Sequence, residues 1–183
     1  MTITKDSDDK LFRRCAVNNA AYDYFTRCSH EDLDISLPPA DLRLWIFNGL
    51  EASSAVMMHH GAVVRSNLIE GFLGKFAPLV EYFLPDITLG TKGIDSYKHL
   101  YSTTCHELSH ASHFSKAGVS YWDRYIKYIM ESFLMSGGMT YGDGTGDSSG
   151  YCEIGEMWAY YMESKLYKGR YGGSYPPFGT GHW

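Results

Sequence analysis

Residues 95–116, DSYKHLYSTTCHELSHASHFSK, decide how the rest of the chain is interpreted. The segment predicts a helix that Asp95 or Ser96 begins and Gly118 ends, because Asp and Ser cap helix N-termini and Gly commonly follows C-termini. Its packing residues recur three or four positions apart, as on one face of a helix. That packing face comprises Tyr97, Leu100, Tyr101, Thr104, Leu108 and Ala111. We expect the opposite face, which carries two histidines, to be presented to a site.

His106 and His110 lie four residues apart, with Glu107 directly after the first histidine. Residues four apart share one face of a helix, about 6 Å apart along the axis. Two imidazoles there can bind one Zn²⁺ at about 2.0–2.1 Å each. The metal acidifies a water molecule, and a carboxylate beside it takes the proton. The spacing predicts a hydrolytic zinc site with His106 and His110 as ligands and Glu107 as general base.

The segment Thr104–His110, TCHELSH, resembles the active-site helix of zincin-like metallopeptidases. The resemblance implies an α+β fold in which a small mixed β-sheet in the N-terminal half packs on this helix and the C-terminal half is mostly helical. It also implies zinc-dependent hydrolysis of a peptide or protein substrate. The five-residue motif is specific for the superfamily, and a looser topological match runs from about 42 to 167. His113 and Lys116 stand where metzincins need Gly and His, which excludes that branch.

A catalytic zinc ion needs three protein ligands and one open position. The helix predicted over 151–167, YCEIGEMWAYYMESKLY, carries two candidate carboxylates, Glu153 and Glu156. Gluzincin peptidases use a Glu from a downstream helix, commonly followed three residues later by a small residue. Glu156 with Ala159 resembles this pattern better than Glu153 does. We therefore predict Glu156 as the third ligand and keep Glu153 as the alternative, with the other carboxylate bonded to a ligand histidine.

Oxyanion stabilisation in such a site commonly comes from a Tyr or a His. Tyr160 follows Glu156 by one turn, and His182 lies in the C-terminal GTGHW, so both are candidates. For each of them, ordinary packing or a place in an irregular tail is the competing interpretation. His113 lies nearly a turn beyond His110, too far to reach the ion, and is interpreted as a supporting or surface residue.

The other segments predict sheet elements first and helices afterwards, which indicates one α+β domain. We divide it into a sheet part at about 40–94, the active-site helix at about 95–116 and a helical part at about 119–167. Periodicity and turn residues further predict helices over 8–28 and 70–83 and from 120, strands over 42–47, 55–59 and 62–68, and an edge strand over 86–89. His59 and His60 are interpreted as the end of a strand.

Composition and charge limit the classes of binding partner that this chain is expected to have. The 183 residues include 16 basic and 21 acidic side chains without a Lys/Arg cluster, which argues against binding to nucleic acid or to an anionic membrane surface. No apolar run is long enough for a membrane span.

The N-terminus lacks the apolar core of a signal peptide, so we expect either a cytosolic protein or a mature or excised piece of a longer precursor. The short chain and its end at His182-Trp183 suggest an excised or truncated domain. The sequence leaves the localisation open, with an extracytoplasmic or secreted precursor as the expectation if the domain is excised.

In an exported protein, Cys15, Cys28, Cys105 and Cys152 would be able to form disulfides, with free buried thiols as the alternative. Two other functions compete with the peptidase. Peptide deformylases carry the same five-residue motif, but they need a cysteine ligand where this chain has Phe72. A zincin-like module that binds zinc without cleaving, for adhesion or glycan handling, is the second alternative. Glu107 argues against it, because a purely structural site needs no general base.

Overall fold

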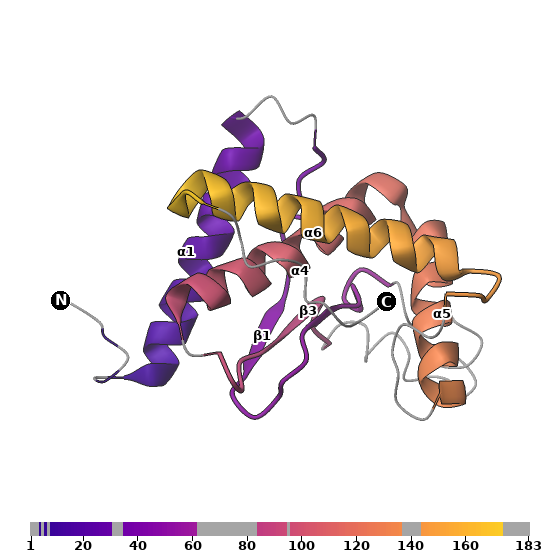
Figure 1. Ribbon diagram of the computed structural model, residues 1–183, viewed down its shortest axis with the longest axis horizontal. Coiled ribbons are helices and arrows are strands. Elements are labelled where there is room, and N and C mark those ends of the chain that lie inside the picture. Colours follow the sequence, from indigo (N-terminus) through magenta and orange to yellow (C-terminus); the bar gives the residue numbers. More distant parts are fainter. Residues whose placement is uncertain are drawn as a thin grey trace.

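Figure 1 shows a mostly helical α+β protein, with a small sheet at one end of a group of helices. The computed structural model describes residues 4, 6, 8–30, 35–61, 84–94, 96–136 and 144–173. Four helices and three strands lie in this part of the chain. They are α1 (Asp9–His30), β1 (Leu44–Phe47), β2 (Ser54–Ala55), β3 (Ile87–Gly90), α4 (Tyr97–Ala117), α5 (Val119–Ser136) and α6 (Ser149–Tyr171).

The central helix α4 has the ends that the sequence predicts. The Ser96 side chain accepts a hydrogen bond from the backbone N–H of His99 at 3.2 Å, which satisfies one donor of the first turn. At the other end Gly118 adopts φ 80°, and its N–H donates to the carbonyl of Phe114. Because a left-handed φ suits glycine, the chain turns here and α5 starts at the next residue.

The sheet is mixed, with the strand order β1-β3-β2. Strand β3 pairs parallel with β1 and antiparallel with β2. The prediction that residues 86–89 form an edge strand is therefore wrong. Both sides of β3 are paired, and Ile87 and Leu89 are fully buried. Gly90 permits a close approach of the chain, because a Cβ there would lie 2.4 Å from the carbonyl oxygen of Ala52.

The remaining strand predictions have mixed outcomes. The strand expected over 42–47 is confirmed as β1, whereas the one expected over 55–59 is reduced to Ser54–Ala55. His59 and His60 consequently lie in a turn after β2 and do not end a strand. The strand predicted over 62–68 and the helix over 70–83 lie outside the described residues.

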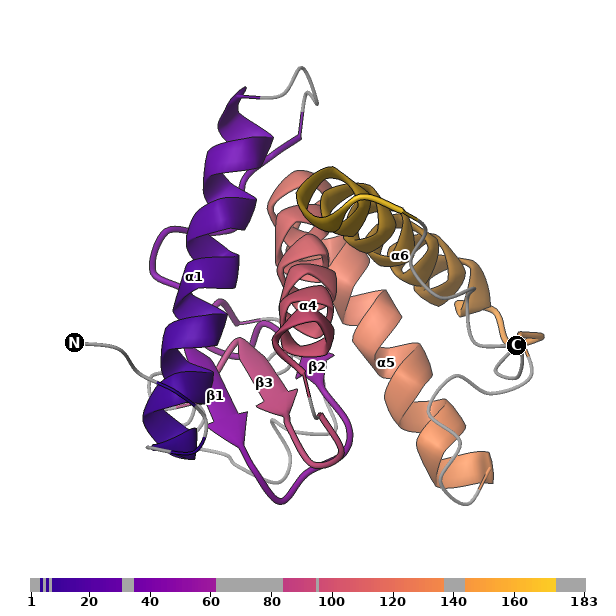
Figure 2. The ribbon, with the colours of Figure 1, turned by 60° about the vertical axis from the view of Figure 1, so that its left-hand side comes forward.

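Helix α4 lies at the centre of the molecule. Figure 2 shows α1 on one side of it, α5 and α6 on the other, and the sheet below it. Helices α1, α5 and α6 and strands β2 and β3 all contact α4. The predicted packing face is confirmed, with Leu100, Tyr101 and Leu108 among its buried residues. The opposite face, which was expected to present the two histidines to a site, is covered by α5 and α6, and His110 is buried there.

The structure bears on two expectations from the sequence, the state of the cysteines and the absence of a membrane span. All four cysteines are free thiols, and Cys28, Cys105 and Cys152 are buried. In the described part of the chain, every helix is too short or too polar to cross a membrane.

Candidate metal centre

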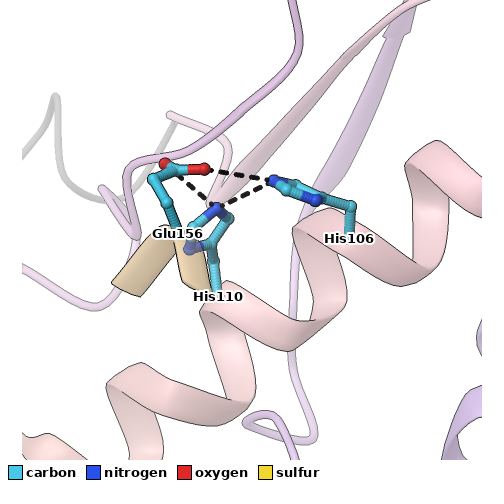
Figure 3. A group of neighbouring side chains, drawn as sticks. All are labelled: His106, His110 and Glu156. Carbon is cyan, nitrogen blue, oxygen red and sulfur yellow. Dashed lines mark hydrogen bonds and ion pairs between the residues drawn. The ribbon is translucent and has the colours of Figure 1, made fainter. Parts of the chain in front are cut away.

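Two histidines of α4 and one glutamate of α6 meet in the interior, as Figure 3 shows. The Nε2 atoms of His106 and His110 are 3.2 Å apart. Glu156 Oε2 lies 3.4 Å from His106 Nε2, and Glu156 Oε1 lies 3.4 Å from His110 Nε2. The ligand atoms of the three residues all lie within 4.8 Å of one another. Of the residues that the structure describes, these form the one group arranged to hold a metal ion.

The donor set fits a zinc ion. Two nitrogens bound at about 2.0–2.1 Å with a tetrahedral angle between them are about 3.3 Å apart, close to the observed separation of the Nε2 atoms. Imidazole nitrogens with a carboxylate oxygen are ligands that zinc accepts. The helical spacing of His106 and His110 sets the first distance. The packing of α6 on α4 supplies the carboxylate.

Small residues allow α6 to approach α4. Ala159 is completely buried one turn after Glu156, on the face of α6 that also carries Glu163. A larger side chain there would push the two helices apart. The position of Ala159 agrees with the small-residue pattern that singled out Glu156. Glu153 lies exposed on α6 and outside the cluster.

Glu163 holds the first histidine, a role that the sequence interpretation gave to Glu153. Its Oε2 is 2.9 Å from His106 Nδ1, and its Oε1 accepts a hydrogen bond from the Ser102 hydroxyl at 2.5 Å. A proton on Nδ1 that points at Glu163 leaves Nε2 free to bind a metal. Glu163 was not among the residues predicted from the sequence, although it stands seven residues after Glu156 and therefore on the same face of α6.

Tyr125 of α5 was also missed, since no sequence signal connects it to the site. Its hydroxyl donates a hydrogen bond to Glu156 Oε1 at 2.8 Å. The tyrosine is buried, and its ring lies 6.0 Å from the ring of His110. Each carboxylate of the site that faces a histidine is thus also held by a hydroxyl, Glu163 by Ser102 and Glu156 by Tyr125.

Glu107 is buried beside the triad. It is 6% exposed, and its Oε2 has no hydrogen-bond partner among the described residues. Burial raises the pKa of this carboxyl, and the positive charges of His106 and His110 offset only part of that rise. A buried carboxyl oxygen without a partner carries a desolvation cost, and such atoms often mark a site that uses them. Glu107 therefore has the environment of a proton acceptor.

Without a metal, His106 and Glu156 shift each other's pKa in opposite directions. Burial lowers the pKa of His106, but hydrogen bonds to Glu156 and Glu163 outweigh it and raise this pKa to about 10. For Glu156, burial raises the pKa, but the charge of His110 and the hydrogen bond with His106 outweigh it and hold the pKa well below its usual range. A metal ion would take the place of the His106 proton, which couples binding to proton release.

Three further residues were singled out from the sequence, Tyr160, His182 and His113, and the structure describes the first and the last. The ring of Tyr160 packs edge-on against His106, with centroids 4.7 Å apart, so this candidate does border the site. His182 lies outside the described residues, as does Phe72, on which the deformylase comparison depends. The ring of His113 packs between those of Tyr121 and Trp122. Burial lowers the pKa of His113 to about 4.

A second cluster of histidines and carboxylates, His59, His60, Asp41 and Asp86, connects segments of the sheet region. His60 Nδ1 lies 2.9 Å from the fully buried Asp86, and His60 Nε2 lies 3.0 Å from Asp41. If both carboxylates are ionised they only accept hydrogen bonds, and both ring nitrogens then donate, so the geometry fits an imidazolium at His60. Burial lowers the pKa of His60, but the bonds to Asp86 and Asp41 outweigh it and raise this pKa. His59 approaches the same Asp41 at 3.5 Å.

No family model, curated protein or solved structure matches this chain. What the site can do therefore follows from its geometry and chemistry. The geometry brings together two imidazole nitrogens and a carboxylate as ligands, with a second carboxylate beside them.

Proposed function

We propose that this chain is a zinc-dependent metallopeptidase of the zincin-like, gluzincin type. The observation that carries the proposal is the meeting of His106, His110 and Glu156 with their ligand atoms within 4.8 Å, next to the buried Glu107. A small mixed sheet against the histidine helix, and a later helix that supplies the third ligand, support the zincin-like assignment. Fold likeness alone does not give a function, so the proposal rests on the site.

Each residue has a distinct task in the proposed reaction. A bound Zn²⁺ would supply the Lewis acid that lets water act as a nucleophile near neutral pH. Glu107 would take the proton from the attacking water and pass it to the leaving amine. Ser102 and Glu163 keep His106 in the orientation that offers Nε2. The substrate is a peptide or protein, because the chemistry of the site suits amide hydrolysis.

Burial of the cluster favours a second candidate, a zinc-binding module without turnover. The side chains of His110 and Glu156 are 4% and 7% exposed, and that of His106 is 13% exposed. Structural zinc sites are closed in this way, whereas catalytic sites keep one position open. Glu107 weighs against this candidate, because a structural site would not need a buried carboxylate with an oxygen left unpaired.

The Glu107→Gln variant tests the proposal. The unaltered chain, loaded with zinc, is first incubated with a peptide library to find a cleaved sequence. Glu107→Gln keeps the size of the side chain but cannot take a proton, so hydrolysis should fall by about 10²–10⁴. Zinc content, measured by elemental analysis, should stay stoichiometric because Glu107 is not a ligand.

Glu153→Gln is the matched control, since it makes the same chemical change on the exposed side of α6. It should cleave at the rate of the unaltered chain. Cleavage by Glu107→Gln at that same rate would refute the assigned role. Stoichiometric zinc without cleavage of any peptide by the unaltered chain would favour the zinc-binding module.

A further inference from the structure

One hydrogen bond connects α5 to the candidate metal centre. Tyr125 donates from its hydroxyl to Glu156 Oε1 at 2.8 Å, and both side chains are buried. The proton of this bond belongs to the tyrosine, because an ionised carboxylate only accepts. One lone pair of Oε1 is therefore engaged by the protein. Both oxygens face a histidine, because Oε1 lies 3.4 Å from His110 Nε2 and Oε2 lies 3.4 Å from His106 Nε2. They differ in the hydrogen bond from Tyr125, which goes to Oε1.

The ring of Tyr125 is fixed from several sides. It packs against Trp122, with centroids 4.7 Å apart, and lies tilted by 33° over His110. On the α6 side it touches the residue before the glutamate. A Cβ on Gly155 would lie 3.3 Å from Tyr125 Cε2, closer than most side chains tolerate. Glycine at position 155 thus lets the tyrosine ring lie against α6 where its hydroxyl meets Glu156.

A carboxylate can bind a metal through one oxygen or through both, and hydrogen bonds to the carboxylate influence that choice. We infer that Tyr125 is a positioning residue that commits Glu156 to bind the metal through Oε2 alone. Single-oxygen binding keeps the coordination number low, so that one position stays available to water. This inference rests on the metal site of the proposed function and does not depend on peptide hydrolysis.

The Tyr125→Phe variant removes the hydroxyl and keeps the ring. Zinc affinity is measured by competition with a chelator, and Co²⁺ is used as a second probe because its visible bands weaken as coordination number rises. Without the hydroxyl, Glu156 is free to engage both oxygens. We expect zinc affinity to fall about 10–100-fold, the usual effect of losing a residue that supports a ligand. We also expect weaker Co²⁺ bands.

Tyr121→Phe is the matched control. It lies on the same helix, and its hydroxyl also makes a 2.8 Å hydrogen bond, but to the backbone carbonyl of Tyr151. Its zinc affinity and Co²⁺ spectrum should equal those of the unaltered chain. A purely structural role for Tyr125 would lower stability and leave the Co²⁺ spectrum of the folded protein unchanged.

A second variant keeps the inference testable if Tyr125→Phe does not fold. Gly155→Ala should displace the ring by a few tenths of an ångström and weaken the Co²⁺ bands in the same direction, but less. Unchanged spectra and affinities in the variants would overturn the inference while leaving the metal site in place. Failure of the unaltered chain to bind Zn²⁺ or Co²⁺ would overturn the proposed function as well, so the two failures are distinguishable.

Discussion

Removing Glu163 should loosen the first histidine without taking away a ligand. Glu163 accepts from His106 Nδ1 at 2.9 Å and from Ser102 at 2.5 Å, and it is 5% exposed. Glu163→Ala deletes the acceptor of both bonds. Glu163→Gln keeps the shape and one acceptor oxygen but removes the charge. The pair separates the effect of the hydrogen bonds from the effect of the charge.

The magnitude follows from the role of the contact. Loss of the group that supports a ligand histidine lowers metal affinity about 10–100-fold, or about 1.4–2.7 kcal/mol. We expect Glu163→Ala near the upper end and Glu163→Gln near the lower end, because the amide can still accept from Nδ1. Glu163→Ala should also destabilise the metal-free protein by about 1–3 kcal/mol, since the buried donors of Ser102 and His106 lose their acceptor.

The assay is zinc competition against a chelator of known affinity, with urea unfolding of the metal-free protein in parallel. Glu153→Ala serves as the control, because it removes an exposed carboxylate from the same helix. Its zinc affinity should equal that of the unaltered chain. Zinc affinity of Glu163→Ala within twofold of the unaltered chain would refute the reasoning about His106.

Two further predictions concern packing and pH. Ala159→Leu should destabilise the protein by about 1–3 kcal/mol, because the completely buried alanine leaves no room between α4 and α6. Urea unfolding measures this loss, and an unchanged urea midpoint would contradict the prediction. His60→Gln should cost more stability at about pH 5.5 than at about pH 9, because the raised pKa of His60 adds stability that is complete below 6.5 and lost as pH rises through the folded-state pKa. Equal losses at both pH values would show that His60 is not an imidazolium held by Asp86 and Asp41.

The local parts of the site could be predicted from the sequence because they depend on helix geometry alone. The spacing of His106 and His110 fixes their common face, and the cap at Ser96 and the glycine at 118 fix the ends of their helix. The structure then brings Glu156 to them. Ala159 was informative since a small residue on α6 is a local sign of a close helix contact.

The non-local parts could not be predicted in this way. Tyr125 meets Glu156 only because the chain turns at Gly118 and α5 then packs beside α6. The central place of β3 depends on pairing with two strands from distant parts of the chain, and a short apolar run carries no sign of how many neighbours it has. Glu163 is an intermediate case, because its place on the face of Glu156 could have been read but its partner could not.

The central claim is that His106, His110 and Glu156 hold a zinc ion. An anomalous-scattering map of zinc-loaded crystals, recorded at the zinc absorption edge, tests it most directly. We predict one peak at about 2.0–2.2 Å from the Nε2 atoms of both histidines and from a Glu156 oxygen. A zinc peak bound by other residues, or crystals of protein soaked in zinc that show no peak between these three side chains, would contradict the claim.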